Sequence, residues 1–135
     1  FPGASTAGPY AVDADFNEVA VLKLTALRKA LNDLTQEIAP LATQNKIMNR
    51  NLNLIQDFEK SAEESEKDAS KYEIFHKFLA LVDELKSEEK QGGATSLELT
   101  LMQLALHKHG VMKLRNEMLE AWQKYVQQKV VDITV

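Results

Sequence analysis

The sequence predicts an all-α protein, folded as an elongated antiparallel bundle with coiled-coil-like seams. Three observations predict this fold class. Residues 41–90 contain no glycine or proline and consist mostly of good helix formers. Before them, apolar residues recur at three- and four-residue spacing, and after them a third apolar stretch follows a helix-start signal at Thr95. We expect three helices with a long central one, or four if the central helix breaks near residues 63–71.

The composition is that of an ordinary single domain. The chain has 135 residues, of which 44% are hydrophobic and 27% charged, so it is unlike a disordered chain. Its formal charge of -4 argues against a nucleic-acid surface, because phosphate binding needs clustered Lys and Arg. No apolar run is long enough to span a membrane. We therefore expect neither nucleic acid nor a membrane span.

Cysteine is absent, which excludes disulfides, thiolate metal sites and cysteine nucleophiles. The chain begins at Phe1 rather than at a methionine. These two features leave the compartment open, and between the alternatives they favour an exported or secreted mature chain.

Residues 1–12 are rich in Pro, Gly, Ala, Ser and Thr and show no periodicity. They predict a flexible N-terminal arm ahead of a single helical domain at 13–130. Asp15 and Glu18 have the spacing of a capping box, so the first helix is predicted to begin near Phe16.

The first helix is predicted to end at about Ile38, because Pro40 lacks an amide hydrogen and disfavours the helical conformation of the residue before it. Its apolar positions repeat with heptad spacing and predict one buried edge. This edge consists of Ala20, Leu24, Leu27, Leu31, Leu34, Ile38 and Leu41.

The central segment, residues 41–90, is apolar in both halves and polar between residues 59 and 71. The polar part is either a loop between two helices or the exposed part of one long helix. It contains no helix breaker and is rich in Glu, Lys and Ala, which favours a continuous helix beginning around Leu41 to Thr43.

Thr95 and Glu98 form a second capping-box pattern, which predicts a third helix from about Ser96 to Gln128. A glycine inside a helix costs about 1 kcal/mol relative to alanine, so Gly110 predicts a kink or a close helix contact. The early apolar residues cover most of the helix circumference, so we expect this part to be buried on more than one side. They are Leu97, Leu99, Leu101, Met102, Leu104, Ala105 and Leu106.

Residues 131–135 alternate between apolar and polar, as a strand does. We expect a C-terminal tail that packs loosely or pairs with another molecule.

The charges are unevenly distributed. Residues 57–90 carry eleven acids and six bases, whereas residues 108–129 carry five bases and two acids. If the third helix packs antiparallel to the second half of the central segment, these charges face each other and help to set the register. The other interpretation is an acidic face for a basic partner, formed by Glu59, Glu63, Glu64, Glu66 and Asp68.

Two apolar sets are candidate binding residues. Trp122 and Tyr125 have the character of interface anchors, although their helical spacing favours the core. A pocket for an apolar ligand such as a fatty acid would lie between the central segment and the third helix. Its predicted lining is Phe75, Phe78, Leu79, Leu104 and Met112.

Glu73 and His76 have the Glu-x-x-His spacing of di-metal bundles. Such sites need a second pair and two more carboxylates, and neither His107 nor His109 has a glutamate three residues before it. We therefore expect no metal, no cofactor and no catalytic residues.

The leading hypothesis is thus a non-enzymatic interaction module that docks to a protein partner, or to copies of itself, through its long helix. The alternative is the carrier of an apolar ligand.

Overall fold

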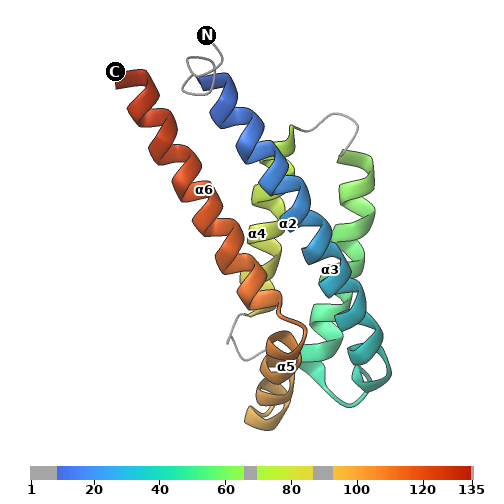
Figure 1. The fold of residues 1–135 in the computed structure, drawn as a ribbon. Coiled ribbons are helices and arrows are strands. Elements are labelled where there is room, and N and C mark those ends of the chain that lie inside the picture. The colour runs from blue at the N-terminus through green and yellow to red at the C-terminus, as the bar shows by residue number, and fades with distance from the viewer. Residues whose placement is uncertain (1–8, 66–69, 87–92, 135) are drawn as a thin grey trace.

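The computed structural model describes residues 9–65, 70–86 and 93–134, and over these ranges it is helical with short turns and no strand. The predicted all-α class is confirmed. Within these ranges, five α-helices pack together (Figure 1): α2 (Pro9–Ile38), α3 (Lys46–Ser65), α4 (Lys71–Leu85), α5 (Ser96–Lys108) and α6 (Val111–Thr134). A short 3-10 turn, η1 (Ala39–Leu41), follows α2. In the described ranges, no helix has the combination of length and apolar character that crossing a membrane requires.

Helix α2 is the central element, since it contacts α3, α4, α5 and α6. Helix α6 runs beside it in the opposite direction, so the start of α2 and the end of α6 lie at the same end of the bundle (Figure 1). The predicted seam is mostly correct: Ala20, Leu27, Leu31, Leu34 and Ile38 are buried and Leu24 is partly buried. The prediction is wrong at Leu41, which is exposed because the chain leaves the α-helical path in η1.

The first helix begins at Pro9 rather than near Phe16, so residues 9–12 of the predicted arm are helical. Proline is well suited to a first helical position, because its fixed φ matches the helix and its missing amide would have no partner there. The Asp15 and Glu18 pair consequently lies inside α2 and caps nothing. Residues 1–8 of the predicted arm lie outside the described residues.

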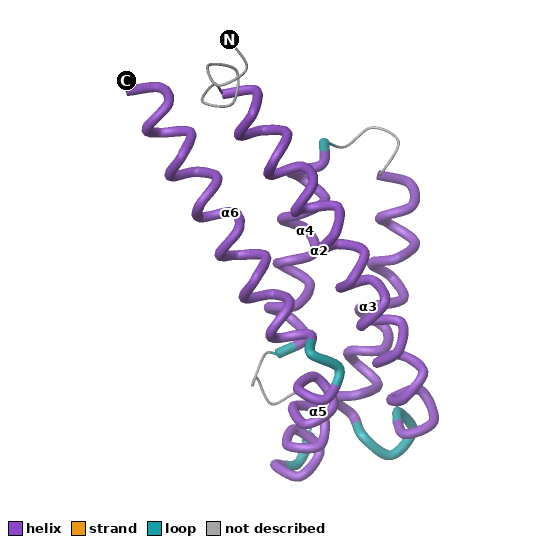
Figure 2. The backbone as a smooth tube through the Cα atoms, viewed as in Figure 1, coloured by secondary structure: helices purple, strands orange, loops and turns teal. Residues whose placement is uncertain are grey.

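The predicted continuous central helix is wrong, and the alternative break near residues 63–71 is the one observed. Helix α3 ends at Ser65, and α4 begins after Ser70, whose extended backbone and side-chain oxygen cap the amide of Glu73. The two helices fold back on each other (Figure 2), with the rings of Phe58 and Phe78 4.7 Å apart. Folding back lets each apolar half cover the other, which a straight rod would not allow.

The limits of this segment also differ from the prediction. Helix α3 starts at Lys46 rather than at residues 41–43, because the chain first passes through η1 and a turn. Helix α4 ends at Leu85, and residues 87–90 of the predicted helix are not among those described.

The third predicted helix is two helices. Helix α5 begins at Ser96 with the predicted Thr95–Glu98 capping box, which is confirmed in both of its hydrogen bonds. It ends at Lys108, and Gly110 follows with a φ of +69°, a conformation that glycine adopts without steric cost.

Helix α6 then continues to Thr134. The strand-like tail is therefore wrong for residues 131–134, and Val135 is outside the described residues. An alternation this short is a weak signal, and the helical i,i+4 hydrogen bond from Gln128 to Asp132 belongs to the helix instead.

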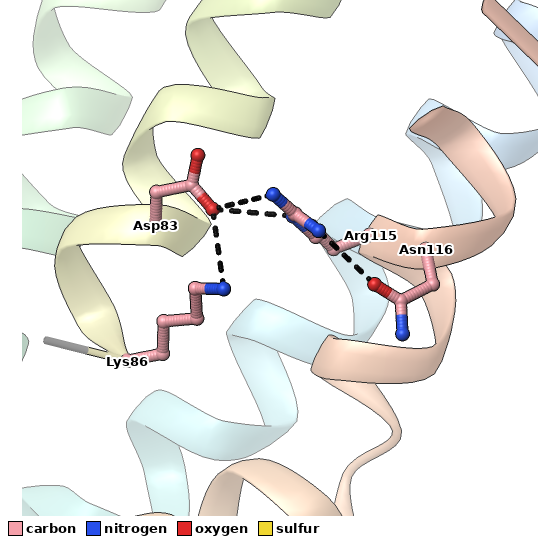
Figure 3. A network of polar contacts seen from close by, with 4 residues as sticks. All are labelled: Asp83, Lys86, Arg115 and Asn116. Carbon is pink, nitrogen blue, oxygen red and sulfur yellow. Dashed lines mark hydrogen bonds and ion pairs between the residues drawn. The ribbon is translucent and has the colours of Figure 1, made fainter. Parts of the chain in front are cut away.

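Within the described ranges, Arg115 and Asp83 form a pair of the kind predicted between the third helix and the second half of the central segment. Figure 3 shows Arg115 of α6 donating to Asp83 of α4, with nitrogen–oxygen distances of 3.1 and 3.0 Å. Lys86 lies 3.8 Å from the same carboxylate oxygen, and Arg115 also donates to Asn116. This network joins α4 to α6 next to the α5–α6 junction.

Candidate functional site

The predicted acidic face is only partly described. Glu59, Glu63 and Glu64 lie exposed on the last turns of α3, whereas Glu66 and Asp68 lie outside the described residues. Glu59 and Glu63 border a small hollow of about 190 Å³, which Arg28 of α2 also lines. These acids therefore sit on a solvated helix face with a basic residue of the same chain close by.

The predicted anchors Trp122 and Tyr125 belong to an aromatic cluster, with Phe16 of α2 at its centre. The ring centroid of Phe16 lies 4.5 Å from that of Tyr125, 5.5 Å from Trp122 and 5.3 Å from Phe75. The hydroxyl groups of Tyr125 and Tyr72 are 3.3 Å apart. The cluster joins α2, α4 and α6, so these two residues have a structural role.

The residues predicted to line an apolar-ligand pocket lie in two different environments. Phe75, Phe78 and Leu79 are buried in the core, and Met112 packs against it. Leu104 instead lies on α5 and is 60% exposed. The structure therefore separates this set into core residues and one surface residue.

Glu73 and His76 are both exposed on α4, and the imidazole of His76 packs against Trp122 with ring centroids 4.2 Å apart. Within the described ranges, no group of three His, Asp or Glu side chains is placed to hold a metal ion.

The predicted burial of α5 on more than one side is wrong for the outer face of this helix. We expected its leucines to be buried on more than one side, but Leu97 is 66%, Leu101 45% and Leu104 60% exposed. Only Met102, Ala105 and Leu106 of this helix are buried. The reason is position: α5 lies at the end of the bundle opposite the start of α2 and the end of α6 (Figure 1), and the face with Met102, Ala105 and Leu106 is the one that the bundle covers. The apolar residues around most of the circumference of α5 could have indicated that this helix has a second, exposed apolar face.

Leu97, Leu101 and Leu104 have i, i+4, i+7 spacing, so they form one stripe along α5. Beside the stripe, Leu41 of η1 is 45% exposed. Between these walls runs a groove of about 500 Å³, with the buried Met48 among its lining residues. We call this space the leucine groove, lined by Leu41, Met48, Leu97, Leu101, Leu104 and Ala105 with Glu37, Gln44, Asn45, Glu98 and Lys108.

One end of the leucine groove is held by Asn45 and Glu98. The side-chain oxygen of Asn45 accepts from the amides of Ile47 and Met48, at 3.0 Å each, and so caps α3. Its amide nitrogen donates to the backbone oxygen of Glu98 at 3.0 Å. The Glu98 carboxylate in turn accepts from the backbone amide of Lys46 at 2.6 Å. These bonds tie the start of α3 to the first turn of α5.

At the other end of the leucine groove, charged side chains hold α5 against α2. Lys108, in the last turn of α5, donates to the carboxylate of Glu37 in α2, and His109 lies 3.3 Å from the same carboxylate. The hydrogen bond from Lys108 is the main reason that the pKa of Glu37 lies below its ordinary value. The two ends together fix α5 relative to α2 and α3.

Low pH should weaken the attachment of α5 to the start of α3 through Glu98. The amide of Lys46, followed by that of Thr95, lowers the pKa of Glu98 below its ordinary value of 4.5, although partial burial acts in the opposite direction. A carboxylate whose pKa is lower in the folded state stabilises the fold above its unfolded pKa and loses this effect as the pH falls through its folded pKa. We expect the free energy of unfolding to fall between about pH 6 and pH 3, and to fall less for Glu98→Gln. Urea unfolding at each pH measures this, and equal pH dependence of the two proteins would contradict it.

A second groove, of about 480 Å³, runs between α2 and α6. Phe16, Val19, Ala121 and Tyr125 line it, and the ion pair of Lys23 with Glu117 spans it from helix to helix. Because this pair and the aromatic cluster already join the two helices, the groove is a seam between them.

Comparison of the sequence with models of protein families, with characterised proteins and with solved structures finds no match.

Proposed function

We propose that this chain is a non-enzymatic interaction module that binds an amphipathic helix in the leucine groove. The described residues of the central segment form α3 and α4 in place of one long helix, so we place the docking surface on α5. One observation carries the proposal: the three leucines of the α5 stripe are exposed to solvent, and the exposed Leu41 lies on the opposite wall of the same groove.

The chemistry of the groove suits a helix. An amphipathic helix presents apolar side chains at i, i+4 and i+7, and such a row can interleave with the stripe on α5. The methionine in the lining is flexible and adapts to the shape of the inserted side chains. The polar bonds at both ends hold the walls in place before binding, which reduces the ordering cost of association.

The test is fluorescence anisotropy with a labelled helical peptide that carries leucines at i, i+4 and i+7, compared with the same peptide carrying serines there. We expect only the leucine peptide to bind, and Leu101→Lys to weaken binding by about tenfold or more, as expected for a central interface residue. Leu22→Lys is the matched control, because Leu22 is also exposed but lies on α2 outside the groove. Equal binding of both peptides, or an equal loss in both variants, would refute the proposal.

A further inference from the structure

We infer that the helix bound in the leucine groove is α5 of a second copy of this chain, docked in the antiparallel orientation. This inference rests on the proposed function, and it names the partner. It is carried by the symmetry of the stripe and by the charges at its two ends.

The stripe is nearly symmetric about its middle leucine. Leu97 lies four residues before Leu101, and Leu104 lies three residues after it. In a two-fold dimer the same surface is used by both copies, and a contact from residue i to residue j is repeated from j to i. Two antiparallel α5 helices would therefore place Leu101 near Leu101 of the second copy, and Leu97 near Leu104 of the second copy.

The charges favour the antiparallel orientation. Helix α5 has an acid in its first turn, Glu98, and a base in its last turn, Lys108. Antiparallel packing brings the acidic end of each helix to the basic end of the other, whereas parallel packing would bring like ends together. Lys108 can take part because its side chain remains 68% exposed while it pairs with Glu37, and an ammonium group has three donors.

The small exposed apolar area of the leucine groove predicts a weak dimer. The exposed fractions of Leu41, Leu97, Leu101 and Leu104 add up to about two whole leucines, far less than the roughly 800 Å² per partner of a stable interface. We therefore expect a dimer whose population rises with protein concentration, and whose formation Leu101→Lys abolishes.

Single cysteines test both the contact and its direction, since the chain has no cysteine of its own. Residues facing each other on packed antiparallel helices come within the Cα distance that a disulfide needs. In a glutathione redox buffer, we expect Leu101→Cys to form covalent dimers about tenfold faster than the control Leu22→Cys, because association raises the effective thiol concentration. Leu97→Cys mixed with Leu104→Cys should form the mixed dimer faster than either forms its own.

Light scattering on the unmodified chain over a range of concentrations gives the second measurement, with a rising mass expected. A constant monomer mass together with cross-linking of Leu101→Cys no faster than the control would overturn the inference. Faster self-linking of Leu97→Cys and of Leu104→Cys than of their mixture would also overturn it, by showing a parallel arrangement. If the leucine peptide binds while the chain stays monomeric, the proposed function stands and only self-docking is wrong. If neither occurs, both fail.

Discussion

Phe16→Ala is expected to lower the free energy of unfolding by about 3–5 kcal/mol, the range for removing a buried aromatic side chain. Phe16 is only 4% exposed and stacks on Tyr125 and Tyr72 while meeting Phe75 and Trp122 edge-on. The substitution removes apolar area and leaves a space between three helices that the surrounding rings cannot all fill at once.

The measurement is urea unfolding followed by the fluorescence of Trp122, the only tryptophan in the chain, whose ring centroid is 5.5 Å from that of Phe16. The midpoint should fall with little change in the slope, which identifies a change in stability rather than in the area exposed. Leu22→Ala, on the exposed side of the same helix, is the control and should change the free energy of unfolding by no more than about 0.5 kcal/mol. A loss of similar size in both variants would show that Phe16 is not at the centre of the cluster.

The sequence predicted the class and the buried edge of α2, because a heptad seam is a local property that tertiary packing preserves. Leu27, Leu31, Leu34 and Ile38 repeat at the right spacing and are all buried. The Thr95–Glu98 capping box was equally local, since both of its bonds join residues three apart. Local chemistry therefore fixed where α5 begins.

The break between α3 and α4 could not be predicted in this way. Residues 59–71 contain no glycine or proline, so helix propensity favoured continuity. What separates the helices is the gain from burying two apolar halves against each other, which depends on residues far apart in the chain. The contact of Phe58 with Phe78 is one contribution to this gain.

The candidate site shows a related limit. Periodicity reports that a helix has two apolar faces but does not say which neighbour covers each, and for α5 one face has no cover within the described chain. The role of Asn45 was hidden for another reason, because one of its hydrogen bonds reaches a residue 53 positions away. Asparagine is nevertheless a favoured N-cap, so the start of α3 at Lys46 could have been located from it.

Asn45→Ala is expected to lower the free energy of unfolding by about 2–3 kcal/mol, because it removes a helix cap and leaves buried backbone groups without partners. Asn45 is 4% exposed, and its side chain accepts from two backbone amides of α3 and donates to the backbone oxygen of Glu98. Asn45→Asp keeps the acceptor for α3 but loses the donor to Glu98. It should therefore be of intermediate stability.

Because this one side chain joins the start of α3 to α5 at one end of the leucine groove, stability and docking should decrease together in Asn45→Ala. The leucine peptide and the Leu101→Cys cross-link measure docking, and urea unfolding measures stability. Leu101→Lys should behave differently, with peptide docking weakened by about tenfold or more and stability nearly unchanged, since Leu101 is already 45% exposed. Unchanged docking in a destabilised Asn45→Ala would mean that α5 is held in place without Asn45, by its other contacts such as the pairing of Lys108 with Glu37.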